Sequence, residues 1–145
     1  MQVASKKAAA AVAAAVIAAL AGTAGAAAIS PWVTKANAVC AAWHKKGEAI
    51  LSSQPRTAAG WYAFMVKARP IEVGMLNGLQ AIPLTRPAGA GRALALAAAD
   101  IHELDVALAA YRSGDKAAFT ADAGAWIADQ RASRAFAAIG AKNCA

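Results

Sequence analysis

Apolar residues recur at three- and four-residue spacing throughout the segment that follows residue 29, and this helical period is the feature that most constrains the fold. Alanine, the strongest helix former, occupies 47 of the 145 positions, whereas β-branched and aromatic residues are few. The clearest apolar stripe consists of Leu94, Ala97, Ile101, Leu104, Leu108 and Tyr111. The sequence therefore predicts an all-α fold.

Residues with strong preferences for helix ends divide this periodic segment into separate helices. Ser30 and Pro31 predict the start of a first helix, because serine can cap free N–H groups and proline lacks an N–H where none is needed. Thr57 is expected to cap a second helix. Pro70 lies within that second helix and is expected either to kink it or to break it, because proline removes a backbone hydrogen bond.

The C-terminal half of the segment has equally clear helix ends. Gly114 is expected to end a third helix in the left-handed conformation, and Asp115 is expected to cap the next one. That last helix is predicted over residues 115–139. A row of small residues along it would let a neighbouring helix approach closely: Ala121, Ala125, Ala128, Ala132, Ala135 and Ile139. Residues 30–145 are thus predicted to form a compact antiparallel bundle of four to five helices after an apolar leader helix.

The leader at residues 1–29 has the layout of a secretory signal peptide. Two lysines precede an apolar stretch, and small residues follow, including Ala24-Gly25-Ala26 and Ala26-Ala27-Ala28, which match the pattern of cleavage sites. Residues 8–29 are also 22 uncharged residues, long enough to span a bilayer, so an uncleaved membrane anchor is the alternative. Both interpretations place residues 30–145 outside the cytoplasm, either secreted or in the cell envelope.

The two cysteines of the chain, Cys40 and Cys144, are predicted to form a disulfide. An exported protein folds in an oxidising compartment, and two cysteines permit one pairing. A core built largely from alanine buries little apolar area per residue, so a covalent link between the first and last helices would add stability that packing lacks. The bundle is therefore expected to be closed by Cys40 and Cys144.

Two other roles for Cys40 stay open from the sequence. His44 follows one helical turn later and could take the proton of the Cys40 thiol in a nucleophilic site. The same pair could ligate a metal ion, as could His102 among the acidic residues of "DIHELD". His102 falls beside the apolar stripe of its helix, however, and is expected to face solvent. Because no triad, catalytic carboxylate pair or zinc-protease motif is found, the sequence predicts no catalytic residue, metal ligand or cofactor and no enzyme.

Charge and aromatic content give weaker indications of a ligand. Residues 30–92 carry eight basic and two acidic residues, whereas residues 93–145 carry five basic and six acidic ones. This asymmetry favours an anionic partner, which Arg86 and Arg92 at the "RPAGAGR" junction could hold. Without a base-stacking motif, no specific nucleic acid is expected. Seven aromatic residues could line a pocket for an apolar ligand, haem or lipid, although helical spacing favours core packing: Trp32, Trp43, Trp61, Tyr62, Phe64, Phe119 and Trp126.

Several segments resemble small exported helical proteins of high-GC actinobacteria. They are the alanine-rich leader, "KANAVC" in the first helix, "GD" before the last helix and the terminal "AIGAKNCA". The resemblance implies export and the pairing of Cys40 with Cys144, and it carries over no activity. We therefore expect a secreted or envelope-associated binding or structural module that contacts an envelope protein or an anionic envelope component. The alternatives are a single-pass accessory subunit anchored in the membrane by residues 8–29 and a haem, metal or lipid binder.

Overall fold

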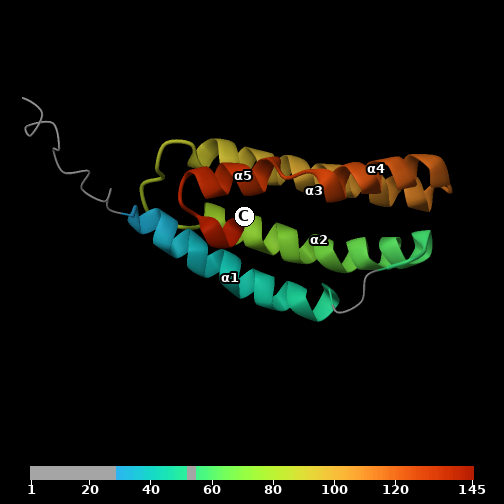
Figure 1. Cartoon of the computed structure of the whole chain (residues 1–145), viewed down its shortest axis with the longest axis horizontal. Helices are drawn as coiled ribbons and strands as arrows, with labels where there is room; N and C mark the ends of the chain where they lie inside the picture. The colour runs from blue at the N-terminus through green and yellow to red at the C-terminus, as the bar shows by residue number, and fades with distance from the viewer. Residues whose placement is uncertain (1–28, 52–54) are drawn as a thin grey trace, which may run out of the picture.

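In the described part of the chain, five α-helices form an antiparallel bundle, close to the positions that capping residues and periodicity predict (Figure 1). The computed structural model describes residues 29–51 and 55–145. The elements in chain order are α1 (Pro31–Leu51), α2 (Ala58–Gln80), α3 (Ala90–Arg112), α4 (Lys116–Ala128), α5 (Arg131–Ala138) and a short 3₁₀ helix, η1 (Lys142–Cys144). The predicted all-α fold class is confirmed.

The helices follow one another as neighbours in space. α1 packs on α2, α2 on α3, and α3 on both α4 and α5, while η1 returns to α1. Figure 1 shows α4 and α5 one after the other along α3, with α1 and α2 on the opposite side of the bundle. The expected leader lies outside the described residues except for Ile29, which is exposed. Among the helices of the described part, none is both long enough and apolar enough to cross a bilayer.

The helix ends form through the hydrogen bonds that the capping residues predict. The Thr57 hydroxyl accepts a hydrogen bond from the Gly60 N–H at 3.1 Å, and the Asp115 carboxylate accepts one from the Ala118 N–H at 2.9 Å. Gly114, at φ 81°, follows α3 in the left-handed region that favours glycine. These three positions confirm the predicted start of α2, end of α3 and start of α4.

Helix α2 continues through Pro70 rather than ending there. Met65 and Ala68 are buried on the N-terminal side of Pro70, and Leu76 and Leu79 are buried on its C-terminal side. Because both halves of the helix are held in the core, the fold tolerates the loss of one backbone hydrogen bond at an exposed proline.

The prediction of one last helix over residues 115–139 is wrong. α4 ends at Ala128 and α5 begins at Arg131, and between them Asp129 is extended, with ψ 122°. The Asp129 carboxylate accepts a hydrogen bond from the backbone N–H of Arg131 at 2.8 Å, so it satisfies a free donor at the start of α5. Because of the break, the predicted row of small residues does not lie on one continuous helix face. On α4 its residues are exposed (Ala121, Ala125, Ala128), whereas on α5 they are buried or half-buried (Ala132, Ala135).

The buried residues form two clusters, one toward each end of α2 and α3. The disulfide-side core contains fourteen buried residues, six of them alanine, from α1, the C-terminal part of α2, the N-terminal part of α3, α5 and the C-terminal residues. The α4-side core is smaller and consists of Met65, Leu104, Ala107, Leu108, Phe119 and Ala123. Both α2 and α3 contribute to the two cores, whereas α1 contributes buried residues only to the first and α4 only to the second.

Two glycines of α2 let α1 approach closely. The indole of Trp43, on α1, lies against Gly74, where an added Cβ would overlap with its Cη2 atom. One turn later, a Cβ at Gly78 would lie 2.9 Å from a methyl group of Val39. Glycine weakens a helix by about 0.5–1 kcal/mol relative to alanine. At these two positions it lowers the local stability of α2 but permits close contact between α1 and α2.

Candidate functional site

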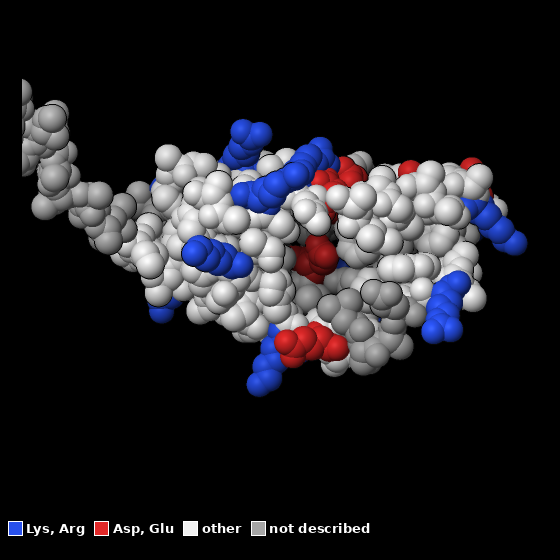
Figure 2. Space-filling model, viewed as in Figure 1, with Lys and Arg blue, Asp and Glu red and all other residues white. Residues whose placement is uncertain are grey.

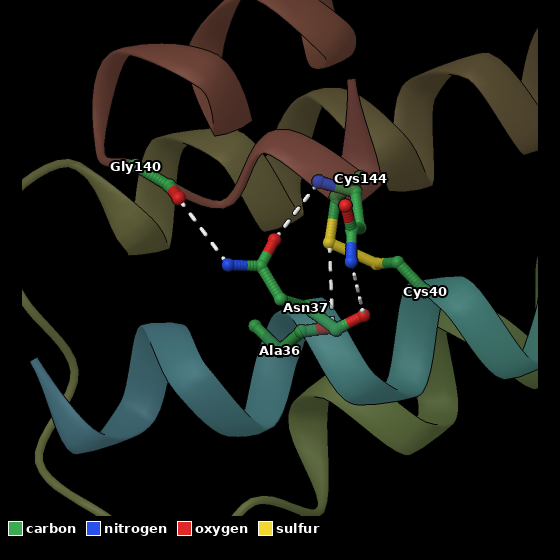
Figure 3. Close-up of a disulfide and its surroundings, with 6 residues drawn as sticks. Ala36, Asn37, Cys40, Gly140 and Cys144 are labelled. Atoms are coloured by element: carbon green, nitrogen blue, oxygen red, sulfur yellow. Dashed lines mark hydrogen bonds between the residues drawn. A yellow bond between two sulfur atoms is a disulfide. The ribbon is translucent and has the colours of Figure 1, made fainter. Parts of the chain in front are cut away.

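Cys40 and Cys144 are joined in a disulfide that ties η1 to α1 (Figure 3). Their sulfur atoms lie 2.04 Å apart, their Cα atoms lie 5.1 Å apart, and 104 positions separate them in the sequence. Cys40 is fully buried on the inner face of α1, and Cys144 is buried in η1. Since both sulfur atoms are in the bond, Cys40 presents no thiolate to His44, neither as a nucleophile nor as a metal ligand.

Asn37 adds polar contacts beside this bond. Its side-chain oxygen accepts a hydrogen bond from the backbone N–H of Asn143 at 2.8 Å, and its amide nitrogen donates to the carbonyl of Gly140 at 3.3 Å (Figure 3). The Asn143 side chain donates in return to the backbone carbonyl of Asn37, also at 3.3 Å. One side chain of α1 thus contacts both ends of the final turn, in addition to the disulfide that joins this turn to α1.

An open cavity of about 480 Å³ lies between α1, α2 and the end of α4. Its walls are mostly apolar, and three aromatic side chains from three different helices line it: Trp43, Phe64 and Trp126. Its polar lining consists of His44, Glu48 and Glu72.

A second cavity of about 390 Å³ adjoins the first and shares four lining residues with it: His44, Phe64, Glu72 and Trp126. It extends past Asp100 and Asp129 to the last residues of the chain. We call the two cavities together the central cleft. Figure 2 shows acidic side chains recessed in a hollow near the middle of this face.

The central cleft exists because the two cores do not meet on this side of the bundle. Phe64 and Trp126 are half-buried at the edge of the α4-side core, where their ring centroids lie 6.5 Å apart. Met75 is half-buried at the edge of the disulfide-side core. The expectation that the aromatic residues pack in the core holds for Trp32 and Phe119, and Tyr62 packs at the edge of the α4-side core. The other four aromatic residues line the cleft: Trp43, Trp61, Phe64 and Trp126.

The break between α4 and α5 brings a charged network to one end of the cleft. The guanidinium of Arg131 donates to Asp129, with Nε 2.6 Å from Oδ2, and to Glu103, with Nη2 2.6 Å from Oε1. These contacts with Arg131 lower the pKa of the Asp129 carboxyl to about 2. The described residues contain one group of three potential metal-ligating side chains whose ligand atoms all lie within 4.8 Å of one another. It consists of Asp100, Glu103 and Asp129.

Three carboxyl groups of the cleft lack a basic partner among the described residues: Glu48 on α1, Glu72 on α2 and Asp100 on α3. Burial raises the pKa of Glu72 above its usual value. Burial, together with the charges of Asp129, Glu103 and Glu72, raises the pKa of Asp100 to about 7. The Oδ1 atom of Asp100 is fully buried without a hydrogen-bond partner. No basic side chain of the described residues therefore pairs with these carboxyl groups, and the raised pKa keeps Asp100 partly protonated near pH 7.

Replacing Asp100 with asparagine is expected to flatten the dependence of stability on pH. The ordinary pKa of Asp100 is 3.8 and its value in the fold is about 7, so folding takes up a proton. Wild-type stability should therefore fall as the pH rises from about 4 to about 7, and the Asp100→Asn variant should be more stable at pH 8. Because the carboxyl is partly exposed, we expect an effect of about 1 kcal/mol.

Urea unfolding at pH 5 and pH 8 measures this difference. The variant Asp122→Asn, on α4 and outside the cleft, is the control and should keep the wild-type change between the two pH values. Parallel pH profiles for the wild type and Asp100→Asn would contradict the assignment.

The other candidate ligand-binding residues, two histidines and two arginines, lie in different parts of the structure. His44 lies on the wall of the central cleft, whereas His102 is exposed on α3, as expected, and joins no group of three metal-ligating side chains within residues 29–51 and 55–145. Arg86 donates to the carbonyl of Gln80 at 3.2 Å. Arg92 instead lines a shallow hollow of about 480 Å³ with two arginines of α5, Arg131 and Arg134. Arg86 and Arg92, which the sequence allowed as a joint anion site, thus have different surroundings.

The sequence alone indicates aromatic residues that could line a pocket, but it predicts neither the position of the cleft nor its carboxylates. A local signal existed for one of them: aspartate two residues before a helical stretch, as in "DQR", is typical of a helix start. Glu72 and Asp100 carry no such signal, since Glu72 is the one acidic residue of α2 and Asp100 is one of three acidic residues in the interior of α3. A cleft lined by aromatic rings and carboxylates can bind a small molecule that has an apolar part and a positive charge.

Comparison of the chain with protein-family models, curated proteins and solved structures found no match.

Proposed function

We propose that this chain is an exported helical binding module, secreted or held in the cell envelope, whose ligand binds in the central cleft. The observation that carries the proposal is the cleft, with its apolar lining and few convergent polar groups. Ligand sites in proteins are typically clefts of about 300–1,000 Å³ with this kind of lining. The cleft also lies between two cores, so each of its walls belongs to a helix that contributes buried residues to one of them.

The leader and the disulfide support the proposed location. Residues 1–29 combine two lysines, an apolar stretch and small residues in the order of a signal peptide. The Cys40–Cys144 disulfide suits an oxidising compartment outside the cytoplasm. The mass of the intact protein from its native source separates the two forms of export: loss of about 26–28 residues indicates a cleaved signal peptide, and the full-length mass indicates an anchored accessory subunit.

We infer binding rather than catalysis because the cleft joins aromatic rings to carboxylates, while the cysteine considered as a nucleophile is held in the disulfide. A haem or metal binder is the alternative. Absorption in the Soret region, or a stoichiometric metal in the purified protein, would favour it. The hollow lined by Arg92, Arg131 and Arg134 supports contact with an anionic envelope component as a secondary role.

The neutral fluorescent probe N-phenyl-1-naphthylamine tests the cleft as a binding site. We expect it to bind the wild type at one site and to bind the Gly47→Phe variant at least about tenfold more weakly. Gly47 lines the cleft, and an added Cβ there meets no atom within 4 Å, so the new ring can fill the space without a clash at its base.

Gly91→Phe is the matched control. Gly91 also meets nothing within 4 Å, and it is exposed in the first turn of α3, away from the cleft. Its variant should bind the probe like the wild type. Equal binding by all three proteins, or no binding by the wild type, would overturn the proposed site.

A further inference from the structure

We propose that the ligand of the central cleft is an organic cation, an ammonium group attached to a short carbon chain. This inference rests on the proposed function, because it identifies the chemistry of the molecule that the cleft binds. Four observations lead to it: the charge of the lining, the partners of those charges, the aromatic rings and the size of the space.

The lining of the cleft has the opposite charge to the rest of the protein. The chain holds fifteen lysines and arginines against eight aspartates and glutamates, a formal net charge of +7. Four of the eight acidic residues line the cleft, namely Glu48, Glu72, Asp100 and Asp129, and no lysine or arginine of the described residues does so. A cavity that is lined by acidic side chains, in a protein with more basic than acidic residues, is complementary in charge to a cation.

Within the described residues, a basic side chain pairs with only one of the four acidic residues that line the cleft, Asp129. Arg131 reaches Asp129 and Glu103 from outside the lining of both cavities. Glu48 and Glu72 form no ion pair within the described part of the chain. A cation placed against Glu72 would therefore gain an electrostatic partner without displacing one, and it would relieve the repulsion that Glu72 exerts on Asp100.

The aromatic walls favour an organic cation over a bare metal ion. An ammonium group is attracted to the face of an aromatic ring, most strongly to tryptophan. The Lys46 ammonium, which is not part of the cleft lining, already lies 3.6 Å from the centroid of the Trp43 ring, so Phe64 and Trp126 are the rings that a ligand could use without displacing it. The three carboxylates that converge most closely are the group that Arg131 binds, so a metal ion would have to compete with that guanidinium.

The size of the space also suits a molecule rather than an ion. The cavity that Trp43, Phe64 and Trp126 line has a volume of about 480 Å³ and opens into the second cavity of about 390 Å³. A methylated ammonium could lie between the rings and Glu72, and its chain could extend toward Asp100.

A pair of probes with the same shape and different charge tests the proposal. Choline carries a trimethylammonium group, and 3,3-dimethylbutan-1-ol is its neutral carbon analogue. Each is titrated into the full chain by calorimetry at about 20 mM salt, and each is used to displace N-phenyl-1-naphthylamine. We expect choline to bind at least about tenfold more tightly than the alcohol, and about 0.5 M salt to reduce this preference.

Glu72→Gln should remove most of the preference while leaving binding of the neutral probe intact, and Glu48→Gln, at an exposed position, should reduce it in part. Asp122→Asn, outside the cleft, should change nothing. If the neutral probe binds in the cleft but choline and its analogue bind equally, the cation inference fails and the binding function stands. If the neutral probe binds the wild type and the Gly47→Phe variant equally, the proposed function itself fails.

Discussion

Reduction of the Cys40–Cys144 disulfide should lower the free energy of unfolding by about 4–5 kcal/mol, a large fraction of the about 5–15 kcal/mol that a domain of this size possesses. The bond closes a loop across 104 positions of sequence, and the entropy that a cross-link removes from the unfolded chain increases with loop length. This contribution should be a large share of the total stability, because six of the fourteen residues in the disulfide-side core are alanine and contribute little apolar area.

Thermal unfolding followed by circular dichroism, with and without a phosphine reductant, measures this effect. We expect the midpoint to fall by about 15–25 °C on reduction. The double variant Cys40→Ala/Cys144→Ala should unfold near the temperature of the reduced wild type, and reductant should not change it further. A midpoint that reductant leaves unchanged would show that packing alone holds η1 on α1.

Alanine substitutions at two glycines should change stability in opposite directions. At Gly74, an added methyl group overlaps with the Trp43 indole, so Gly74→Ala should destabilise the protein by about 1–3 kcal/mol despite its better helix propensity. At Gly47, nothing lies within 4 Å of the added group, so Gly47→Ala should stabilise it by up to about 1 kcal/mol.

The comparison is controlled because both variants make the same chemical change in the interior of a long helix. Urea unfolding of the two proteins at one pH gives the difference, expected to be about 2 kcal/mol or more. Equal effects at the two positions would mean that helix propensity dominates and that α1 does not depend on its contact with α2 at Gly74.

The sequence was sufficient to predict the helices wherever their ends are determined locally. Thr57, Gly114 and Asp115 act through their own side chains or backbone conformations, so single residues predict the start of α2, the end of α3 and the start of α4. The break at Asp129 is different. No proline or glycine marks it, and alanines continue the helical spacing on both sides. It is accompanied by contacts of Asp129 and Arg131 with α3, which no local pattern contains.

The candidate site was harder to predict than the fold for a related reason. Helical spacing identifies the inner face of each helix, and this placed Trp43, Phe64 and Trp126 correctly toward other helices. It does not indicate which inner faces meet and which leave a gap between them. Glu72 and Asp100 approach each other only because α2 and α3 pack together, so their mutual effect is a property of the tertiary structure.

The division of the interior into two cores has a consequence for how the protein opens. The disulfide joins two elements of one core, so it restrains that end directly, while α4 belongs entirely to the other. Backbone amides of α4 should therefore exchange with solvent deuterium through local unfolding events that leave the covalently closed end intact. A molecule held against Phe64, Trp126 and Glu72 would touch residues at the junction of the two units, and its binding should slow exchange in α4.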